Sequence, residues 1–318
     1  VEPKRRIATR PTRASKERRL RAKTKRSNVK RLRQGKPDLG ESGCRVPKRK
    51  GFDAMPCFSA NISFLFTELP FRDRFKAAAE AGFTGVEFLF PYDEPAEELA
   101  SLARDNDLEV VLFNVWPGDW EEGWRGLAGI PGQEAEFASR LDQARVYARV
   151  LNCRRLHAMA GLESQGANVE TLVGNLRFAA AEAAADGIVI LTEPINRKDM
   201  PGYLVHRSDQ ARDIIAEVAE PNVRLQFDCY HREVEEGSVL SAISEYANLT
   251  AHYQIASPPD RGEPDHGTLD YAEVFQLIDA RGYGGWVGCE YRPRNGTMHG
   301  LSWVAELGVR LGDESGVL

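Results

Sequence analysis

The chain of 318 residues has few cysteines and no long apolar run. Its five cysteines are an odd number, lie far apart and include no Cys-x-x-Cys pair, which argues against a disulfide framework and against a thiolate zinc site. A reducing, cytoplasmic location fits this usage best. No stretch approaches the roughly 18 consecutive apolar residues of a bilayer span, and residues 1–54 lack the apolar segment of a secretory signal. We therefore expect neither export nor membrane insertion.

Motifs for nucleotide binding and for serine hydrolysis are also missing. Residues 63–70, after the first strand-like run, read Ser-Phe-Leu-Phe-Thr-Glu-Leu-Pro and contain no glycine-rich phosphate loop. No Gly-x-Ser-x-Gly nucleophile elbow occurs. The sequence therefore argues against an enzyme that uses an organic redox cofactor and against a serine hydrolase.

Charge is divided unevenly along the chain. Residues 1–54 hold 20 Lys and Arg against 5 Asp and Glu, and residues 55–318 hold 22 against 42, so the two parts carry +15 and −20. Only 13 of the first 54 residues are hydrophobic, which predicts a disordered basic extension. Because the chain begins with Val and Met55 stands before the first strand-like run, we interpret residues 1–54 as upstream sequence outside the native protein. The alternatives are a nucleic-acid or anionic-surface arm and an organelle transit peptide.

From Met55 onward, short apolar runs alternate with longer segments of helical periodicity. Most runs are nearly continuously apolar, as in strands that are buried on both faces. Eight such alternations within about 260 residues predict one (β/α)8 TIM barrel domain over residues 55–318. A doubly wound open sheet is the competing layout, but it would normally carry a phosphate loop after its first strand.

The predicted strands are Cys57–Ile62, Thr84–Phe90, Glu109–Val115, Arg154–Met159, Ile188–Thr192, Val223–Phe227, Thr250–Ile255 and Trp286–Glu290. The predicted helices are Arg72–Ala81, Glu94–Asn106, Glu134–Leu151, Val169–Asp186, Ser208–Val218, Val239–Tyr246, Tyr271–Arg281 and Gly300–Leu311.

Four consecutive predicted strands, the fifth to the eighth, carry a metal-binding residue type at or near their ends. These residues are Glu193, Asp228, Gln254 and Glu290. Since the chemistry of such barrels lies where the strands end, we expect the four side chains to converge. Three carboxylates and one amide oxygen suit a hard divalent ion, which favours Mg²⁺ or Mn²⁺ over Zn²⁺. Each carboxylate alone is more typical of a solvated rim or a helix cap than of a metal ligand, whereas Gln254 alone is equally typical of a hydrogen bond to a neighbouring strand.

Two histidines lie near the same strand ends. His231 follows Asp228 by three residues, at the predicted start of the loop over the mouth, where we expect a functional role. His252 precedes Gln254 by two residues and should lie one layer deeper, with a buried hydrogen bond as its expected role.

An arginine near this rim is predicted to bind an anionic substrate. A shell of three carboxylates around a divalent ion leaves a net charge near −1, so an acidic substrate would require a guanidinium. Arg261, after the seventh predicted strand, is the expected residue. The alternative is a surface arginine that pairs with Asp260 or Glu263.

Nine short stretches together resemble the hydroxypyruvate isomerases of the xylose-isomerase-like barrels. They follow the family order from Met55 to about Leu311, whereas the basic extension has no counterpart. Together they are specific to the family and less so to the exact substrate. The stretches are Phe58–Ser63, Gly85–Tyr92, Gly118–Trp120, Arg125–Gly132, Glu193–Asn196, Asp228–His231, Gln254–Ala256, Arg261–Pro264 and Gly285–Tyr291.

The resemblance implies a mononuclear metal centre with an acid/base pair. It implies that Glu193, Asp228, Gln254 and Glu290 bind one divalent ion, and that Glu193 and Glu290 also transfer the proton. In related ketose epimerases the positions matching His231 and Arg261 contact substrate oxygens. Those epimerases have His where Gln254 stands, a difference that this chain shares with the hydroxypyruvate isomerases.

One further substrate contact is implied by a single-position match. Asp199, six residues after Glu193, falls where the same epimerases keep an acidic substrate contact.

The implied reaction interconverts hydroxypyruvate and tartronate semialdehyde, small hydroxy-oxo acids, through an enediolate that the metal stabilises. A 2-oxo-tetronate isomerase or a ketose epimerase of the same superfamily is the nearest alternative. A phosphodiesterase like the endonuclease IV barrels would need a His-rich multinuclear site, and the chain has only six histidines. A non-catalytic nucleic-acid-binding protein would leave the strand-end residues unexplained. A homo-oligomer is compatible with the sequence.

Overall fold

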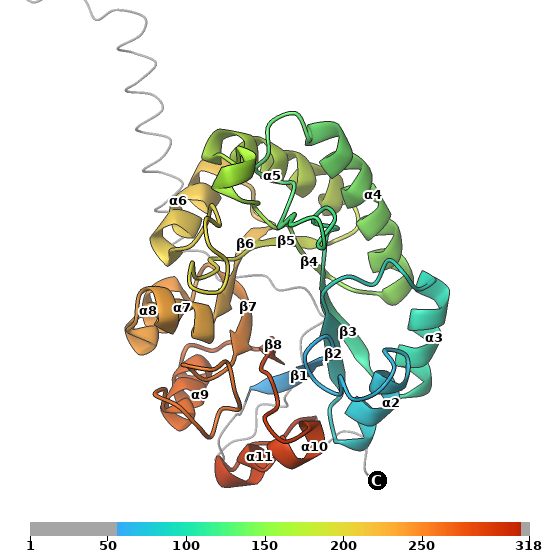
Figure 1. Ribbon diagram of the computed structural model, residues 1–318, viewed down its shortest axis with the longest axis vertical. Coiled ribbons are helices and arrows are strands. Elements are labelled where there is room, and N and C mark those ends of the chain that lie inside the picture. Colours follow the sequence, from blue (N-terminus) through green and yellow to red (C-terminus); the bar gives the residue numbers. More distant parts are fainter. Residues whose placement is uncertain (1–55, 313–318) are drawn as a thin grey trace, which may run out of the picture.

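The computed structural model describes residues 56–312, which form a closed barrel of parallel strands surrounded by helices (Figure 1). Each strand pairs with the next along the chain, and β8 pairs with β1 to close the barrel. The predicted (β/α)8 barrel is therefore confirmed. The predicted basic extension lies outside the described residues.

The strands are β1 (Cys57–Asn61), β2 (Gly85–Phe88), β3 (Glu109–Asn114), β4 (Arg155–His157), β5 (Val189–Thr192), β6 (Val223–Asp228), β7 (Thr250–Ile255) and β8 (Trp286–Cys289). The helices are α2 (Asp73–Glu80), α3 (Ala96–Asp105), α4 (Glu134–Leu151), α5 (Val169–Ala184), α6 (Ser208–Val218), α7 (Cys229–Glu235), α8 (Val239–Tyr246), α9 (Tyr271–Ala280), α10 (Thr297–Gly300) and α11 (Trp303–Glu306), with a 3₁₀ turn η1 (Glu163–Gln165).

The helices form because each has one apolar face that the barrel can bury. In α5 the side chains of Leu172, Leu176, Ala179 and Ala183 recur at three- and four-residue spacing and are fully buried. Asn168 caps the helix by accepting a hydrogen bond from the Thr171 amide (2.9 Å). Such faces build the main core between the helix layer and the outer surface of the barrel.

A second, smaller apolar cluster comes mainly from the odd-numbered strands. It contains Cys57, Val111, Leu112, Leu191, Ala251 and Trp286. This origin matches the layered filling of (β/α)8 barrels, in which alternate strands supply one layer.

Two predicted elements differ from the structure. The terminal helix predicted over Gly300–Leu311 is replaced by the short helices α10 and α11. Helix α11 ends because Gly308 adopts a left-handed backbone conformation (φ 66°), with the Val309 amide donating back to the Val304 carbonyl (2.9 Å). The Trp303 ring packs against Phe58, and its Nε1–H donates to the Tyr291 hydroxyl (3.0 Å).

The loop expected at His231 is the second difference, since α7 begins directly after β6. Asp228 ends the strand and caps the helix, its Oδ1 accepting from the amides of Tyr230 (2.7 Å) and His231 (3.4 Å).

None of the helices within residues 56–312 combines the length and the apolar character that a bilayer crossing requires.

Candidate active site

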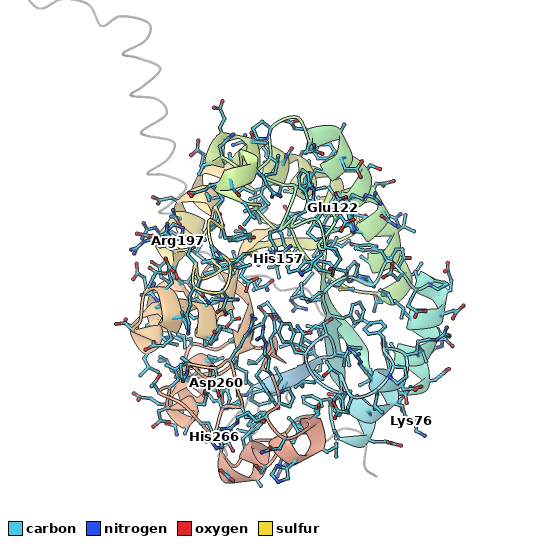
Figure 2. All side chains as sticks on the ribbon, in the orientation of Figure 1. Lys76, Glu122, His157, Arg197, Asp260 and His266 are labelled. Atoms are coloured by element: carbon cyan, nitrogen blue, oxygen red, sulfur yellow. The ribbon has the colours of Figure 1, made fainter. Side chains whose placement is uncertain are left out.

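A cavity of about 220 Å³ opens at the carboxyl ends of the strands. All eight strands, or the residues directly after them, contribute to its wall. Figure 2 shows His157 of β4 near the centre of the barrel, whereas Lys76 and Arg197 lie at its periphery. Six of the seven predicted site residues line this cavity: Glu193, Asp199, His231, Gln254, Arg261 and Glu290. The seventh, Asp228, lies directly behind them with a fully buried side chain.

Glu193, Asp228 and His231 form a cluster that could hold a metal ion. One ligand atom of each lies within 4.8 Å of the others, and all three residues are buried. Glu193 Oε1 and Asp228 Oδ2 have no hydrogen-bond partner among the described residues. Burying an unpaired carboxylate oxygen is costly unless a cation or a donor completes it. Two orphaned oxygens at one place therefore fit a hard divalent cation.

Glu290 lies across the cavity and has partners on both oxygens. Its Oε1 pairs with the Arg261 guanidinium, and its Oε2 accepts from Asn61 Nδ2 (2.9 Å) and Gln254 Nε2 (2.5 Å). Arg261 Nη2 also lies 3.6 Å from Asp228 Oδ2. The guanidinium is buried and partly neutralises two of the carboxylates, so Arg261 is not the surface arginine of the alternative interpretation.

Gln254 connects the two sides of the site. Its amide nitrogen faces Glu290 and Glu87 (2.9 Å), while its oxygen accepts from Gln226 Nε2 (2.6 Å). Gln226 Nε2 also donates to Glu193 Oε2 (3.0 Å). With no cation between them, the nitrogen faces the carboxylates, because an amide oxygen there would be repelled. Gln254 here makes the strand-to-strand hydrogen bond of one interpretation. Metal ligation, the other interpretation, would require its oxygen to face the carboxylates and stays a prediction.

The crowded carboxylates shift one another's ionisation. Burial, together with the charges of Glu290 and Asp228, raises the pKa of Glu193 well above its ordinary value. Burial raises the pKa of Glu290 to about 8, although Arg261 opposes the shift. Burial raises the pKa of Asp228 too, again against Arg261. Carboxyl groups with such raised pKa values can hold or release a proton near neutral pH, as acid/base catalysis requires.

Sequence reasoning gave no role to Glu87, which is fully buried at the centre of the polar network. Its carboxylate accepts from Ser59 Oγ (2.9 Å) and Gln254 Nε2 (2.9 Å), and lies 2.9 Å from Nε2 of His252. Although burial raises the pKa of Glu87, His252 and these donors together lower it below its ordinary value. A charged residue inside the otherwise apolar run Thr84–Phe90 was the available signal. His252 has the deeper position expected for it.

Two more buried residues, Gln226 of β6 and His157 of β4, lie next to the Glu193 carboxylate. Gln226 donates to it, and His157 Nδ1 lies 3.5 Å from Glu193 Oε2. Burial lowers the pKa of His157 to about 3, so this histidine is neutral. It lies inside a predicted strand, where the sequence alone does not separate it from a packing residue.

Aromatic side chains form the outer part of the wall. Phe64, Phe90 and Trp120 line the cavity. The Arg261 guanidinium lies over the rings of Phe64 (4.8 Å) and Tyr230 (5.2 Å). Arg125, which also reaches the cavity, stacks on Trp120 at 3.8 Å. These rings give the two guanidinium groups flat faces to stack on.

The site and the barrel together define the class of protein. The chain belongs to the xylose isomerase-like TIM barrel family, whose family model matches residues 75–307. It is 48% identical over 254 residues to a 2-oxo-tetronate isomerase of Cupriavidus necator, covering 79% of this chain and 98% of the relative. It is 43% identical over 251 residues to a hydroxypyruvate isomerase of Escherichia coli, covering 78% of this chain and 97% of the relative.

A solved structure titled AP endonuclease, family 2, from Brucella melitensis is also similar. It has a TM-score of 0.77 and 46% identity, and the match covers 79% of this chain and 99% of the other. Isomerases thus stand among the relatives that match nearly over their whole length.

Proposed function

We propose that the protein is an aldose-ketose type isomerase of small hydroxy-oxo acids, with hydroxypyruvate and tartronate semialdehyde as its substrate pair. In this reaction a proton leaves the hydroxymethyl carbon of hydroxypyruvate, an enediolate forms, and a proton returns to the neighbouring carbon. No electrons are exchanged with an external redox partner.

One observation carries the proposal: Glu193 and Glu290 line the same small cavity and both have raised pKa values. One carboxylate removes the proton, and the other, as the neutral acid, supplies a proton to the adjacent carbon. Glu193 follows β5 and Glu290 follows β8, and the proposed substrate would lie between them.

A divalent ion, Mg²⁺ or Mn²⁺, is part of this proposal. Glu193, Asp228, Gln254 and Glu290 would hold it, and the orphaned oxygens of Glu193 and Asp228 support this assignment. When bound, the ion supplies Lewis-acid stabilisation for the negative charge of the enediolate.

Arg261 and Asp199 complete the proposed substrate contacts. Arg261 provides the positive charge for the substrate carboxylate, because its guanidinium lines the cavity. Asp199 also lines the cavity and would accept a hydrogen bond from a substrate hydroxyl. The cavity volume of about 220 Å³ suits a metabolite of a few carbons, since drug-sized ligands occupy roughly 300–1,000 Å³.

A 2-oxo-tetronate is the second candidate substrate, favoured by the relative of that name at 48% identity. The proton shift between neighbouring carbons is of the same kind. The difference lies in one additional hydroxylated carbon of the substrate.

The deciding experiment follows each acid by NMR in deuterated water, with metal-stripped protein and with protein restored by Mg²⁺ or Mn²⁺. We expect isomerisation with deuterium incorporated at the reacting carbon, and only in the restored samples. Abasic-site DNA serves as the control, and we expect no cleavage. Turnover of a neutral ketose alone, or cleavage of the DNA without isomerisation of either acid, would overturn the proposal.

A further inference from the structure

Asn196, three residues after Glu193, contacts the imidazole of His231. Its side-chain nitrogen Nδ2 lies 2.6 Å from His231 Nδ1, and its backbone nitrogen lies 3.4 Å from the same atom. Asn196 is fully buried and His231 is 4% exposed, so water does not compete for this contact.

The orientation of the Asn196 amide is fixed by a third group. Its oxygen Oδ1 accepts a hydrogen bond from the backbone amide of Asp199 (2.8 Å), which can only donate. The amide nitrogen therefore turns toward His231. It also lies 3.4 Å from Asp199 Oδ2, a second acceptor that favours the same orientation.

Both groups that face His231 Nδ1 are N–H donors, so Nδ1 must present its lone pair. A proton on Nδ1 would point at the hydrogens of Asn196, which excludes the Nδ1–H tautomer and also the imidazolium. A neutral imidazole has one N–H, and here it lies on Nε2.

His231 Nε2 faces the cavity side of the carboxylate cluster. It lies 3.6 Å from Asp228 Oδ2 and 3.9 Å from Glu193 Oε1, both longer than a hydrogen bond. The Nε2–H is therefore free to donate to an oxygen placed in the cavity that His231 lines.

We infer that Asn196 is a positioning residue that fixes His231 as the Nε2–H tautomer. The substrate contact that the family resemblance implies for His231 is then a donated hydrogen bond from Nε2. The substrate part of this inference rests on the proposed function. A metal bond would require the Nε2 lone pair, which this tautomer lacks. Within the cluster, Glu193 and Asp228 are then the metal ligands, and His231 is a hydrogen-bond donor.

This division of roles matters for the chemistry. A hydrogen-bond donor beside the carbonyl oxygen of the substrate stabilises the negative charge that develops there in the enediolate. The ligands that remain for the ion are then all oxygen atoms, which suits Mg²⁺ or Mn²⁺ and disfavours Zn²⁺.

The first test reads the tautomer directly in the wild-type protein. Long-range ¹H–¹⁵N correlation spectra of ¹⁵N-histidine-labelled protein distinguish a protonated from an unprotonated ring nitrogen, and His231→Gln identifies the signals of this residue. We expect protonated Nε2 and unprotonated Nδ1, unchanged when Mg²⁺ is added. A protonated Nδ1, or loss of the Nε2 proton on adding Mg²⁺, would overturn the inference.

The second test uses Asn196→Asp. This nearly isosteric change keeps the acceptor for the Asp199 amide but replaces the N–H donor, 2.6 Å from Nδ1, by a carboxylate oxygen. The close acceptor outweighs the backbone N–H at 3.4 Å, so Nδ1 gains a proton, and in the neutral ring Nε2 loses its proton in the same spectra. We expect kcat/KM to fall about 10- to 100-fold, the scale of one lost hydrogen bond to a charged group.

Asn175→Asp is the matched control, since Asn175 is a buried asparagine of α5 whose Nδ2 donates to the Ala128 carbonyl (2.8 Å), away from the cavity. The folded control should keep the His231 spectrum and kcat/KM of the wild type. An Asn196→Asp protein with an unprotonated Nε2 and unchanged kcat/KM would overturn the donor role, and so would one that keeps the Nε2 proton but loses kcat/KM to the same extent. If neither acid is isomerised by the wild type, the proposed function fails, whereas the tautomer is still decided by the spectra.

Discussion

Glu193 and Glu290 differ in their surroundings although both are proposed to transfer the proton. Glu193 has an oxygen without a partner, whereas Glu290 is held by Arg261, Asn61 and Gln254. Glu193→Gln and Glu290→Gln keep the shape and remove the ionisable group. We expect each to lower kcat by at least about 10²-fold, as for a general acid or base.

Glu273→Gln, at an exposed position in the first turn of α9, is the control for this pair. Its turnover should equal that of the wild type. Near-normal turnover in Glu193→Gln or Glu290→Gln would remove that residue from the catalytic pair, provided that circular dichroism shows an intact fold.

Arg261→Gln tests how the substrate carboxylate is held. A charge-assisted hydrogen bond contributes about 1.5–3 kcal/mol, so KM for hydroxypyruvate should rise about 10- to 100-fold. KM for an uncharged ketose should change far less, which makes the neutral substrate the internal control. Steady-state kinetics on both substrates measure the difference. Equal increases would mean that Arg261 serves only Glu290 and Asp228.

The sequence predicted the residues whose type and position both stand out. Glu193, Asp228 and Glu290 end apolar strands, and it is their occurrence together that can be noticed in the sequence. Asn196 and Glu87 were not assigned roles, because their importance depends on partners that fold beside them: His231 lies 35 residues from Asn196, and Gln254 lies 167 residues from Glu87. The spacing of residues along the sequence does not show that such distant residues lie side by side in the fold.

Strand β8 passes close to the Glu87 carboxylate because it has a glycine there. A Cβ added to Gly288 would lie 2.3 Å from Glu87 Oε1, closer than atoms approach without displacement. Gly288→Ala should therefore push Glu87 away from Ser59 and Gln254, at a cost of about 1–3 kcal/mol in the free energy of unfolding. Chemical denaturation measures this change.

Gly284→Ala provides the matched control, since a Cβ at Gly284, two residues before β8, meets nothing within 4 Å. We expect this control to keep wild-type stability and activity. If Gly288→Ala is equally harmless, the polar network has more room than its close contacts indicate.

The predicted elements were correct where burial alone determines them. All eight predicted strands occur with shifts of a few residues at their ends, because continuously apolar runs of this length are buried on both faces. Helix α7 was missed since it has only seven residues and no preceding loop. Its start depends on the Asp228 cap, a contact that serves the helix and the site at once.

Metal binding should stabilise the whole molecule, because the ion would hold side chains from β5, β6, β7 and β8 together. At a free Mg²⁺ concentration 100 times Kd, the expected gain is about 2.7 kcal/mol. For a barrel of this size that corresponds to a rise in Tm of about 5–10 °C over protein in a chelator. Differential scanning fluorimetry measures the shift.

Asp228→Asn removes one proposed ligand charge but keeps a side-chain oxygen that can cap α7. Its Tm should respond to Mg²⁺ much less than that of the wild type. If the Tm of the wild type does not change when Mg²⁺ or Mn²⁺ is added, the proposed metal site is contradicted.

We propose that residues 1–54 contribute to neither stability nor catalysis. Within the described part of the chain, β1 already has both ladder partners, β2 and β8, so the barrel closes from Cys57 onward. A chain of residues 55–318 should match the full chain in kcat/KM and Tm at equal salt, with reductant in both samples. A loss of several degrees would show that the extension packs on the barrel.

The hydrogen bond from Asn61 to Glu290 joins residues that are 229 positions apart. These two side chains meet only when the seam between β1 and β8 closes, and contacts of such long range form slowly because the chain entropy must be lost first. During refolding, helical signal should therefore return before the proposed isomerase turnover. The rate of turnover is therefore proportional to the fraction of molecules whose barrel is closed. A partly folded chain with most of its helices in place should have no activity.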